Sequence, residues 1–274
     1  MTTSLQHVTS ADGTRIAVRR VGTGRPLVVL PGAMNGIDSW SAVAAELDGF
    51  EVWLVARRGY PPSDEGPGEK SFAAETADVR ALVEAADRGD GVHLAGHSYG
   101  ALLALHTALA DPSRLRSLLL YEPPVLAIGD HLPQALADYR ARLAAGSPEG
   151  AIMGFLTEVA GVTPQVMAAL QEQAGEIDPD DDLEPGEFVT GVLHDLEALA
   201  GAWPGAAHFA DVGVPTLLMA GADSWDPLPA SADALERVLP DVRRVTWPGQ
   251  SHFANMADPA LVARTIRDFV GPDR

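Results

Sequence analysis

Short apolar runs alternate with stretches of helical spacing over the first 124 and the last 66 or so residues of the chain. Apolar runs of this length, bounded by turn residues, predict buried strands, which we place at residues 25–30, 50–56, 91–95, 115–121, 214–220 and 242–247. An earlier hairpin over residues 5–21 is predicted around Ala11-Asp12-Gly13. Helices are predicted at residues 37–47, 71–87, 101–110 and 230–239, and a last helix has Asp258 at its cap and Pro259 in its first turn. Strands that alternate with helices indicate an α/β protein with a mostly parallel, doubly wound sheet.

This alternation stops between residues 125 and 208. Helical stretches occur at residues 131–145, 149–159, 164–173 and 186–203, and no segment between them has a convincing strand pattern. We therefore interpret residues 125–208 as an inserted helical cap. The remaining parts, residues 1–124 and 209–274, form the predicted core domain.

Composition narrows the class of protein. The 274 residues suffice for one large domain with an insertion, and 46% of them are hydrophobic, as in globular proteins. The absence of cysteine excludes disulfides, thiolate catalysis and cysteine metal sites. A formal charge of −19 argues against binding to nucleic acid or to anionic membranes. The N-terminal residues lack a basic region followed by an apolar run, so we expect a cytoplasmic protein. We also expect it to be a monomer or a homodimer.

The pentapeptide Gly96-His97-Ser98-Tyr99-Gly100 fits the G-x-S-x-G pattern of a nucleophile elbow. A predicted strand precedes it and a predicted helix follows it, which is the context that this motif requires. Gly96 and Gly100 suit a place where strand and helix cross closely, and the helix N-terminus directs partial positive charge at the Ser98 hydroxyl. We therefore predict that Ser98 is a nucleophile; the alternative is a turn with a structural role only.

A serine hydroxyl needs a base, and the candidate base is His252. It directly follows the last predicted strand, so a parallel sheet delivers it to the same edge as Ser98. The alternative is a loop histidine without a catalytic role. Six other histidines are expected to have packing or ordinary polar roles: His93, His97, His106, His131, His194 and His208.

The whole pattern resembles the α/β-hydrolase superfamily. Besides the elbow, the matching segments are Leu30-Pro31-Gly32-Ala33, Arg57-Arg58-Gly59-Tyr60, Gly221-Ala222-Asp223-Ser224 and Pro248-Gly249-Gln250-Ser251-His252. The resemblance implies a sheet of about eight strands with an inserted cap, no metal or cofactor, and an oxyanion hole formed by the backbone N–H groups of Ala33 and Tyr99. Pro31 departs from the histidine that commonly precedes the glycine in this family.

The acid that would orient His252 has more than one candidate. Where the family usually places it, this chain has Ser224, with Asp223 and Asp226 nearby. Glu122, at the end of the strand beside the elbow strand, resembles the acid position of haloalkane dehalogenases and of lactonases that open zearalenone. We favour Glu122, with Asp223 as the alternative and Asp226 or no acid as the remainder. A non-catalytic Glu122 would cap a helix or form a salt bridge at the cap hinge.

Two features of the predicted cap receive other interpretations. The carboxylate run over residues 176–184 lacks the spacing and the glycine of a calcium loop, so we expect a solvated loop. The cap also carries a set of large apolar residues, of which some are expected to line a substrate pocket and most to hold the cap helices together: Met153, Phe155, Leu156, Met167, Phe188, Leu193 and Trp203.

The predicted function is hydrolysis of a small hydrophobic ester or lactone through an acyl-enzyme. Thioester hydrolysis, C–C bond hydrolysis and cofactor-free haloperoxidase-like activity are the alternatives among enzymes. Dehalogenation is disfavoured because that chemistry uses a carboxylate nucleophile where this chain has Ser98. From a different class, the same fold could serve as a ligand receptor, a reading that a complete triad disfavours.

Overall fold

A single eight-stranded sheet forms the centre of the computed structural model, which describes residues 4–168 and 185–271. The strand order is β1-β2-β4-β3-β5-β6-β7-β8, with β1 and β2 antiparallel to their neighbours and the other pairs parallel. The strands are β1 (Gln6–Thr9), β2 (Arg15–Gly22), β3 (Arg25–Leu30), β4 (Phe50–Val55), β5 (Val92–His97), β6 (Leu115–Tyr121), β7 (Thr216–Gly221) and β8 (Val242–Trp247). The predicted mostly parallel sheet and its N-terminal hairpin are confirmed.

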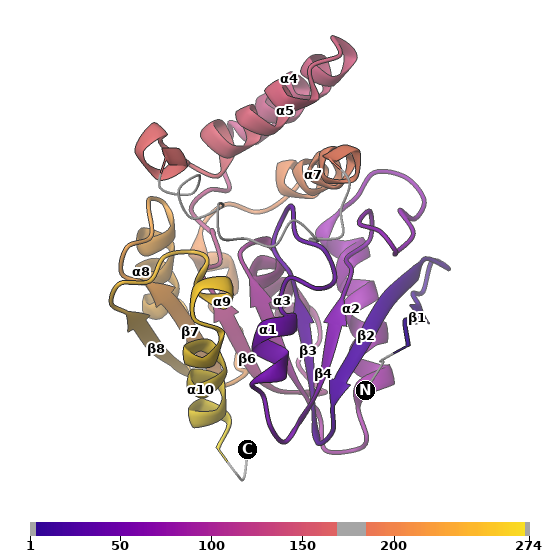
Figure 1. The fold of residues 1–274 in the computed structure, drawn as a ribbon, viewed down its shortest axis with the longest axis vertical. Helices are drawn as coiled ribbons and strands as arrows, with labels where there is room; N and C mark the ends of the chain where they lie inside the picture. Colours follow the sequence, from indigo (N-terminus) through magenta and orange to yellow (C-terminus); the bar gives the residue numbers. More distant parts are fainter. Residues whose placement is uncertain (1–3, 169–184, 272–274) are drawn as a thin grey trace.

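Helices cover both faces of this sheet, so its inner strands are apolar on both sides (Figure 1). In β3, Val28 and Leu30 join the core on one face, while Leu27 and Val29 join the core on the other. The first face is covered by α2 (Phe72–Ala86), α3 (Tyr99–Ala110) and α8 (Leu228–Val238). The second is covered by α1 (Ser41–Ala45), α9 (Ala254–Ala257) and α10 (Pro259–Val270).

Most predicted helices are found near their expected bounds, and α1 is the exception. The predicted helix over residues 37–47 shrinks to Ser41–Ala45, because backbone turns at Gly36 and Asp38 occupy the preceding residues. Its predicted inner face is correct nonetheless, since Trp40, Val43 and Leu47 are all buried. Elsewhere the predicted helix starts hold: Ser71 Oγ accepts from Ala74 N at 3.2 Å, and Asp258 Oδ1 accepts from Leu261 N at 3.0 Å.

Helices inserted between β6 and β7 lie over one end of the sheet (Figure 1), and we call them the overlying helices. They are α4 (Leu132–Ala144), α5 (Pro148–Gly154), a π-helix η1 (Phe155–Val159) and α7 (Pro185–Ala200), with a 3₁₀ turn η2 (Ala206–Phe209) after them. Residues 164–168 are also helical, and the described part of this insertion contains no strand, as predicted. The rest of the predicted helix 164–173 and the whole carboxylate run 176–184 lie outside the described residues. The division into a core of 1–124 and 209–274 and a cap of 125–208 stays a prediction.

Candidate active site

The elbow at Ser98 has the strand, turn and helix that its sequence predicts. Ser98 lies between β5 and α3 with φ 53° and ψ −118°, a conformation that residues other than glycine rarely adopt. A Cβ atom at Gly96 would collide with the backbone of Gly100, and one at Gly100 would collide with the Leu30 carbonyl. The two glycines therefore allow the close crossing that holds Ser98 in this strained turn.

Backbone strain gathers around this elbow. Among the described residues other than glycine, positive φ angles occur only at Met34, Ser98 and Glu122, with values of 62°, 53° and 46°. Each follows the carboxyl end of a central strand, β3, β5 or β6. Strained conformations of this kind persist where the surroundings enforce them, and they cluster at functional sites.

His252 reaches the same edge of the sheet from the loop after β8, and Glu122 is its partner. His252 Nδ1 and Glu122 Oε2 are 2.6 Å apart, and both side chains are buried. The second carboxylate oxygen, Glu122 Oε1, accepts a hydrogen bond from Gly221 N at 2.7 Å. The buried carboxylate is thus fixed between the His252 imidazole and the Gly221 backbone amide.

The two aspartates considered as alternatives lie elsewhere. Asp223 and Asp226 are both exposed, whereas Glu122 is 1% exposed. The Asp223 backbone N donates to Gln250 O at 2.9 Å, which shapes the loop after β7. Within the described part of the chain, His252 Nδ1 is hydrogen-bonded to Glu122 and to neither aspartate. Geometry therefore favours Glu122 as the group that orients His252.

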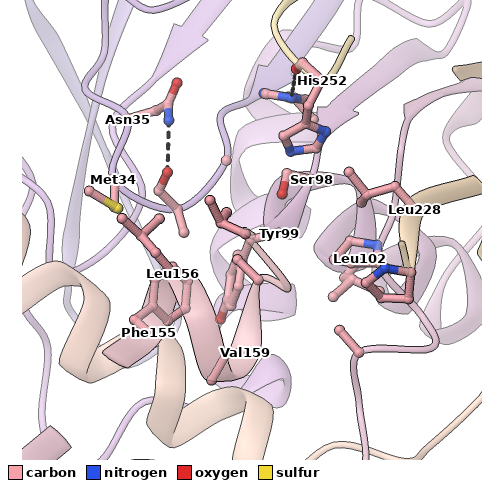
Figure 2. A pocket seen from close by; sticks show the side chains of 18 of the residues that line it. Met34, Asn35, Ser98, Tyr99, Leu102, Phe155, Leu156, Val159, Leu228 and His252 are labelled. Carbon is pink, nitrogen blue, oxygen red and sulfur yellow. Dashed lines mark hydrogen bonds between the residues drawn. The ribbon is translucent and has the colours of Figure 1, made fainter. Parts of the chain in front are cut away.

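Ser98 and His252 line one cavity of about 310 Å³. Figure 2 shows Ser98 next to the His252 ring, without a hydrogen bond drawn between them. Contacts in catalytic pairs are often loose before substrate binds, so this arrangement is compatible with proton transfer. The His252 ring packs between aromatic neighbours, with ring centroids 4.5 Å from His97 and 5.5 Å from Trp225.

The two amides predicted to form the oxyanion hole border the same cavity. Ala33 follows β3, and Tyr99 is the first residue of α3, so its N–H has no partner within that helix. Neither N–H donates to another group in the parts of the chain that the structure describes. The Ala33 carbonyl accepts from Asn35 Nδ2 at 2.7 Å, which fixes the loop beyond it. Both amides are therefore available to a ligand beside Ser98.

Apart from Asn35 and His97, the rest of the cavity wall is mainly apolar. Among the described residues that line the cavity there is no aspartate, glutamate, lysine or arginine. The π-helix η1 supplies Phe155, Leu156 and Val159 on the side of the cavity away from His252 (Figure 2). The remaining large apolar contributors come from helices α3, α7 and α8 and from the loops after β3, η1, β7 and β8: Met34, Leu102, Val162, Leu199, Trp225, Leu228 and Phe253.

The prediction for the apolar cap set is correct only in part. Phe155 and Leu156 line the cavity, whereas Met153 and Trp203 are 44% and 69% exposed. Leu193 packs against the core on the α2–α3 side of the sheet. Sequence reasoning missed most of the cavity wall, because its residues come from separate loops and helices with no common motif.

The other histidines have packing or ordinary polar contacts. His97 Nε2 bonds to the His252 carbonyl oxygen at 2.9 Å, and burial, together with the nearby His252, holds the His97 pKa well below its usual value. Burial likewise lowers the pKa of His106 to about 4, where its ring stacks on Phe72 at 4.3 Å. His93 bonds to Ser117 at 2.8 Å. His97 is thus a neutral support behind His252.

The described residues contain neither a candidate metal site nor a candidate membrane-spanning helix. No set of three or more His, Asp or Glu side chains there is arranged to hold a metal ion. No helix there is both long enough and apolar enough to cross a bilayer.

Comparison with known proteins gives matches over most of the chain. The alpha/beta hydrolase family matches residues 27–265. A non-heme chloroperoxidase from Streptomyces lividans is 32% identical over 174 residues, 57% of this chain and 63% of that protein, so the match spans less than two thirds of the relative. An alpha/beta hydrolase from Sphaerobacter thermophilus, 28% identical, superposes with a TM-score of 0.78 over 97% of this chain and 100% of that one. A thermophilic esterase from Thermogutta terrifontis, 21% identical, shares the fold with a TM-score of 0.81 over 97% and 98% of the two chains.

Proposed function

Because the chain belongs to the alpha/beta hydrolase family, we propose that it is a serine hydrolase that cleaves a carboxylic ester or lactone of a small hydrophobic substrate. The observation that carries this proposal is the buried His252–Glu122 hydrogen bond of 2.6 Å beside Ser98 in an apolar cavity. A nucleophile, a base and a group that orients the base meet at one edge of the sheet, as covalent acyl transfer requires.

In the proposed reaction Ser98 Oγ attacks the ester carbonyl and passes its proton to His252 Nε2. Glu122 holds the His252 Nδ1–H tautomer and stabilises the imidazolium that forms. The carbonyl oxygen, which becomes an oxyanion, accepts hydrogen bonds from the Ala33 and Tyr99 amides. His252 then protonates the departing alkoxide, and an acyl-Ser98 ester remains. Water, deprotonated by His252, attacks that ester and releases the carboxylic acid together with free Ser98.

The direct test uses the protein without any substitution. We expect it to hydrolyse p-nitrophenyl butyrate and to react covalently with a fluorophosphonate probe, and peptide mapping by mass spectrometry should locate the adduct on Ser98. A folded protein with neither turnover nor labelling would contradict the proposal and favour a ligand receptor. Labelling at another serine would contradict the assignment of the nucleophile.

The apolar wall leads to a prediction about acyl charge. A carboxylate buried there would lose its hydration and find no cation among the described residues that line the cavity, which is strongly unfavourable. We expect kcat/KM for p-nitrophenyl hemisuccinate to be about 100-fold or more below that for p-nitrophenyl butyrate, whose acyl chain has the same number of carbons but no charge. Steady-state kinetics with both esters would measure this, and similar values would show that a cation reaches the acyl site.

A further inference from the structure

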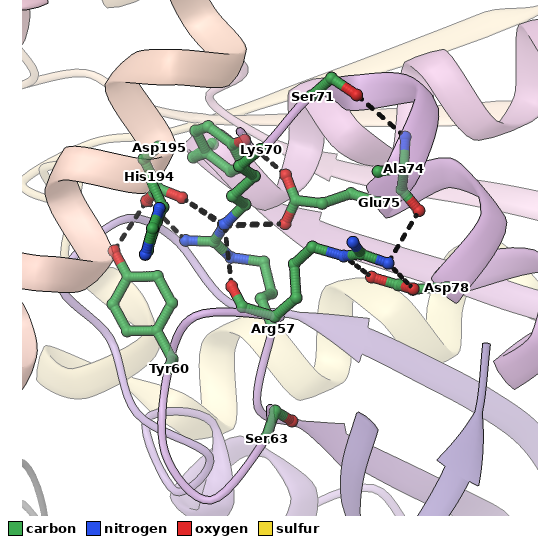
Figure 3. A network of polar contacts seen from close by, with 12 residues as sticks. Arg57, Tyr60, Ser63, Lys70, Ser71, Ala74, Glu75, Asp78, His194 and Asp195 are labelled. Atoms are coloured by element: carbon green, nitrogen blue, oxygen red, sulfur yellow. Dashed lines mark hydrogen bonds and ion pairs between the residues drawn. The ribbon is translucent and has the colours of Figure 1, made fainter. Parts of the chain in front are cut away.

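Four charged side chains lie buried under the overlying helices, and no local sequence pattern indicates that they meet. Arg57 and Lys70 are the cations, Glu75 and Asp195 the anions, and each side chain is at most 2% exposed. We call them the buried charge cluster (Figure 3). Arg57 follows β4, Lys70 precedes α2, Glu75 lies in α2 and Asp195 in α7. The cluster therefore joins the overlying helices to the sheet layer.

Asp195 is the centre of this cluster. Its carboxylate accepts two hydrogen bonds from the Arg57 guanidinium, at 2.7 and 2.8 Å, and one from Lys70 Nζ at 2.7 Å. Burial alone would raise the pKa of Asp195, but Arg57 and Lys70 outweigh it and lower the pKa to about 2. The carboxylate thus stays ionised at neutral pH and holds Arg57 in a bidentate pair of fixed orientation.

Arg57 also contacts the loop that follows β3. Its Nε donates to Pro31 O at 3.0 Å and its Nη2 donates to Gly32 O at 3.1 Å. The Gly32 carbonyl and the Ala33 N–H belong to the same planar trans peptide group, in which they point in opposite directions. A cation held on the carbonyl therefore fixes the direction of the Ala33 N–H and, by polarising the peptide, strengthens it as a donor.

Two tyrosines extend the same connection. Tyr60 OH accepts from Met34 N at 3.1 Å and donates to Asp195 Oδ2 at 2.7 Å, so the loop is held on both sides of Ala33. Tyr99, the residue with the second amide, donates its hydroxyl to Glu75. The Arg57 guanidinium carbon lies 4.7 and 4.2 Å from the centres of the two tyrosine rings. Burial and the nearby carboxylates raise the pKa of both phenols, so both hydroxyls remain donors.

We propose that Asp195 is a positioning residue: it holds Arg57 so that the Ala33 amide points at the oxyanion. Because Asp195 belongs to α7, catalysis then depends on how this helix packs over the sheet. This inference rests on the proposed function. It predicts that disturbing Asp195 slows the chemical step rather than substrate binding, because the oxyanion exists only in the transition state and the tetrahedral intermediate.

The test is Asp195→Asn, with Asp78→Asn as the matched control. Asp78 is also buried and accepts two hydrogen bonds from its neighbouring arginine, Arg58, both at 2.6 Å, but that pair does not contact residues 31–34. With p-nitrophenyl butyrate, Asp195→Asn should lower kcat about 10- to 100-fold, somewhat less than loss of an oxyanion donor, with little change in KM. Asp78→Asn should leave kcat within about twofold, whatever it does to the unfolding temperature.

A second variant guards against misfolding, since Asp195→Asn leaves one buried positive charge in excess. The double variant Lys70→Met with Asp195→Asn restores a neutral cluster and still lacks the carboxylate that grips Arg57. An alkylboronic acid, which forms a tetrahedral adduct on Ser98, supplies a second measurement. Its inhibition constant should rise by about the factor by which kcat/KM falls, a correlation that a purely structural role for Asp195 would not produce.

The outcomes separate this inference from the proposed function. If the unaltered protein neither turns over esters nor labels, the proposed function fails. If the unaltered protein is active and the folded Asp195 variants keep its kcat and its boronic acid affinity, only the role of Asp195 is overturned. Equal losses of kcat in Asp195→Asn and Asp78→Asn would also overturn the role of Asp195, because the Asp78–Arg58 pair does not contact the loop after β3.

Discussion

Ser98→Ala is expected to lower kcat for p-nitrophenyl butyrate by about 10⁶-fold, the scale on which serine hydrolases lose activity without their nucleophile. The remaining rate would come from binding and from the two backbone amides, which the substitution leaves in place. Fluorophosphonate labelling should disappear in the same variant. Steady-state kinetics and intact-protein mass spectrometry measure the two effects independently.

The fold should tolerate this substitution. Alanine at φ 53° carries strain similar to that of serine, so the elbow neither gains nor loses much conformational freedom, and the unfolding temperature should change little. Ser224→Ala is the matched control, since the buried Ser224 Oγ has no hydrogen-bond partner in the described part of the chain and follows β7 near the same sheet edge. It should keep wild-type kcat and labelling. Activity that survives in a folded Ser98→Ala variant would place the nucleophile elsewhere.

The elbow and the sheet could be predicted because their signals are local or follow from sheet topology. Ser98 stands between a short apolar strand and a helix, so a few adjacent residues carry the whole pattern. His252 follows the last strand, and parallel strands bring their carboxyl ends to one edge, so its arrival beside Ser98 needs no contact information. The same argument brings Glu122 to this edge from β6.

The buried charge cluster could not be predicted in this way. Charged residues are usually solvated, and no periodicity indicates that Arg57 meets Asp195, 138 positions away, inside the protein. Their contact depends on how α7 packs over the loops that follow β3 and β4, a property of the tertiary structure. The short α1 has a related cause, since turns at Gly36 and Asp38 replace a helix that the apolar spacing favours.

Glu122→Gln is expected to lower kcat by about 10⁴-fold, the effect seen when the orienting acid of a serine triad becomes an amide. The glutamine oxygen can still accept from Gly221 N, so the loop geometry should survive. Its NH₂ group would then face His252 Nδ1 as a donor, which places the imidazole proton on Nε2. In that tautomer Nε2 cannot accept the proton of Ser98, and the base is lost while every heavy atom stays in place.

Asp223→Asn and Asp226→Asn are the matched controls, because each makes the same change from acid to amide at a candidate for the same role. Both aspartates are exposed, and neither is bonded to His252 in the described part of the chain, so kcat should stay within about twofold of the unaltered protein. The same p-nitrophenyl butyrate assay ranks the three variants. A larger loss from either aspartate than from Glu122 would mean that the loop after β7 rearranges during the reaction to supply the acid, and the buried Glu122 would then be a structural partner of Gly221 N.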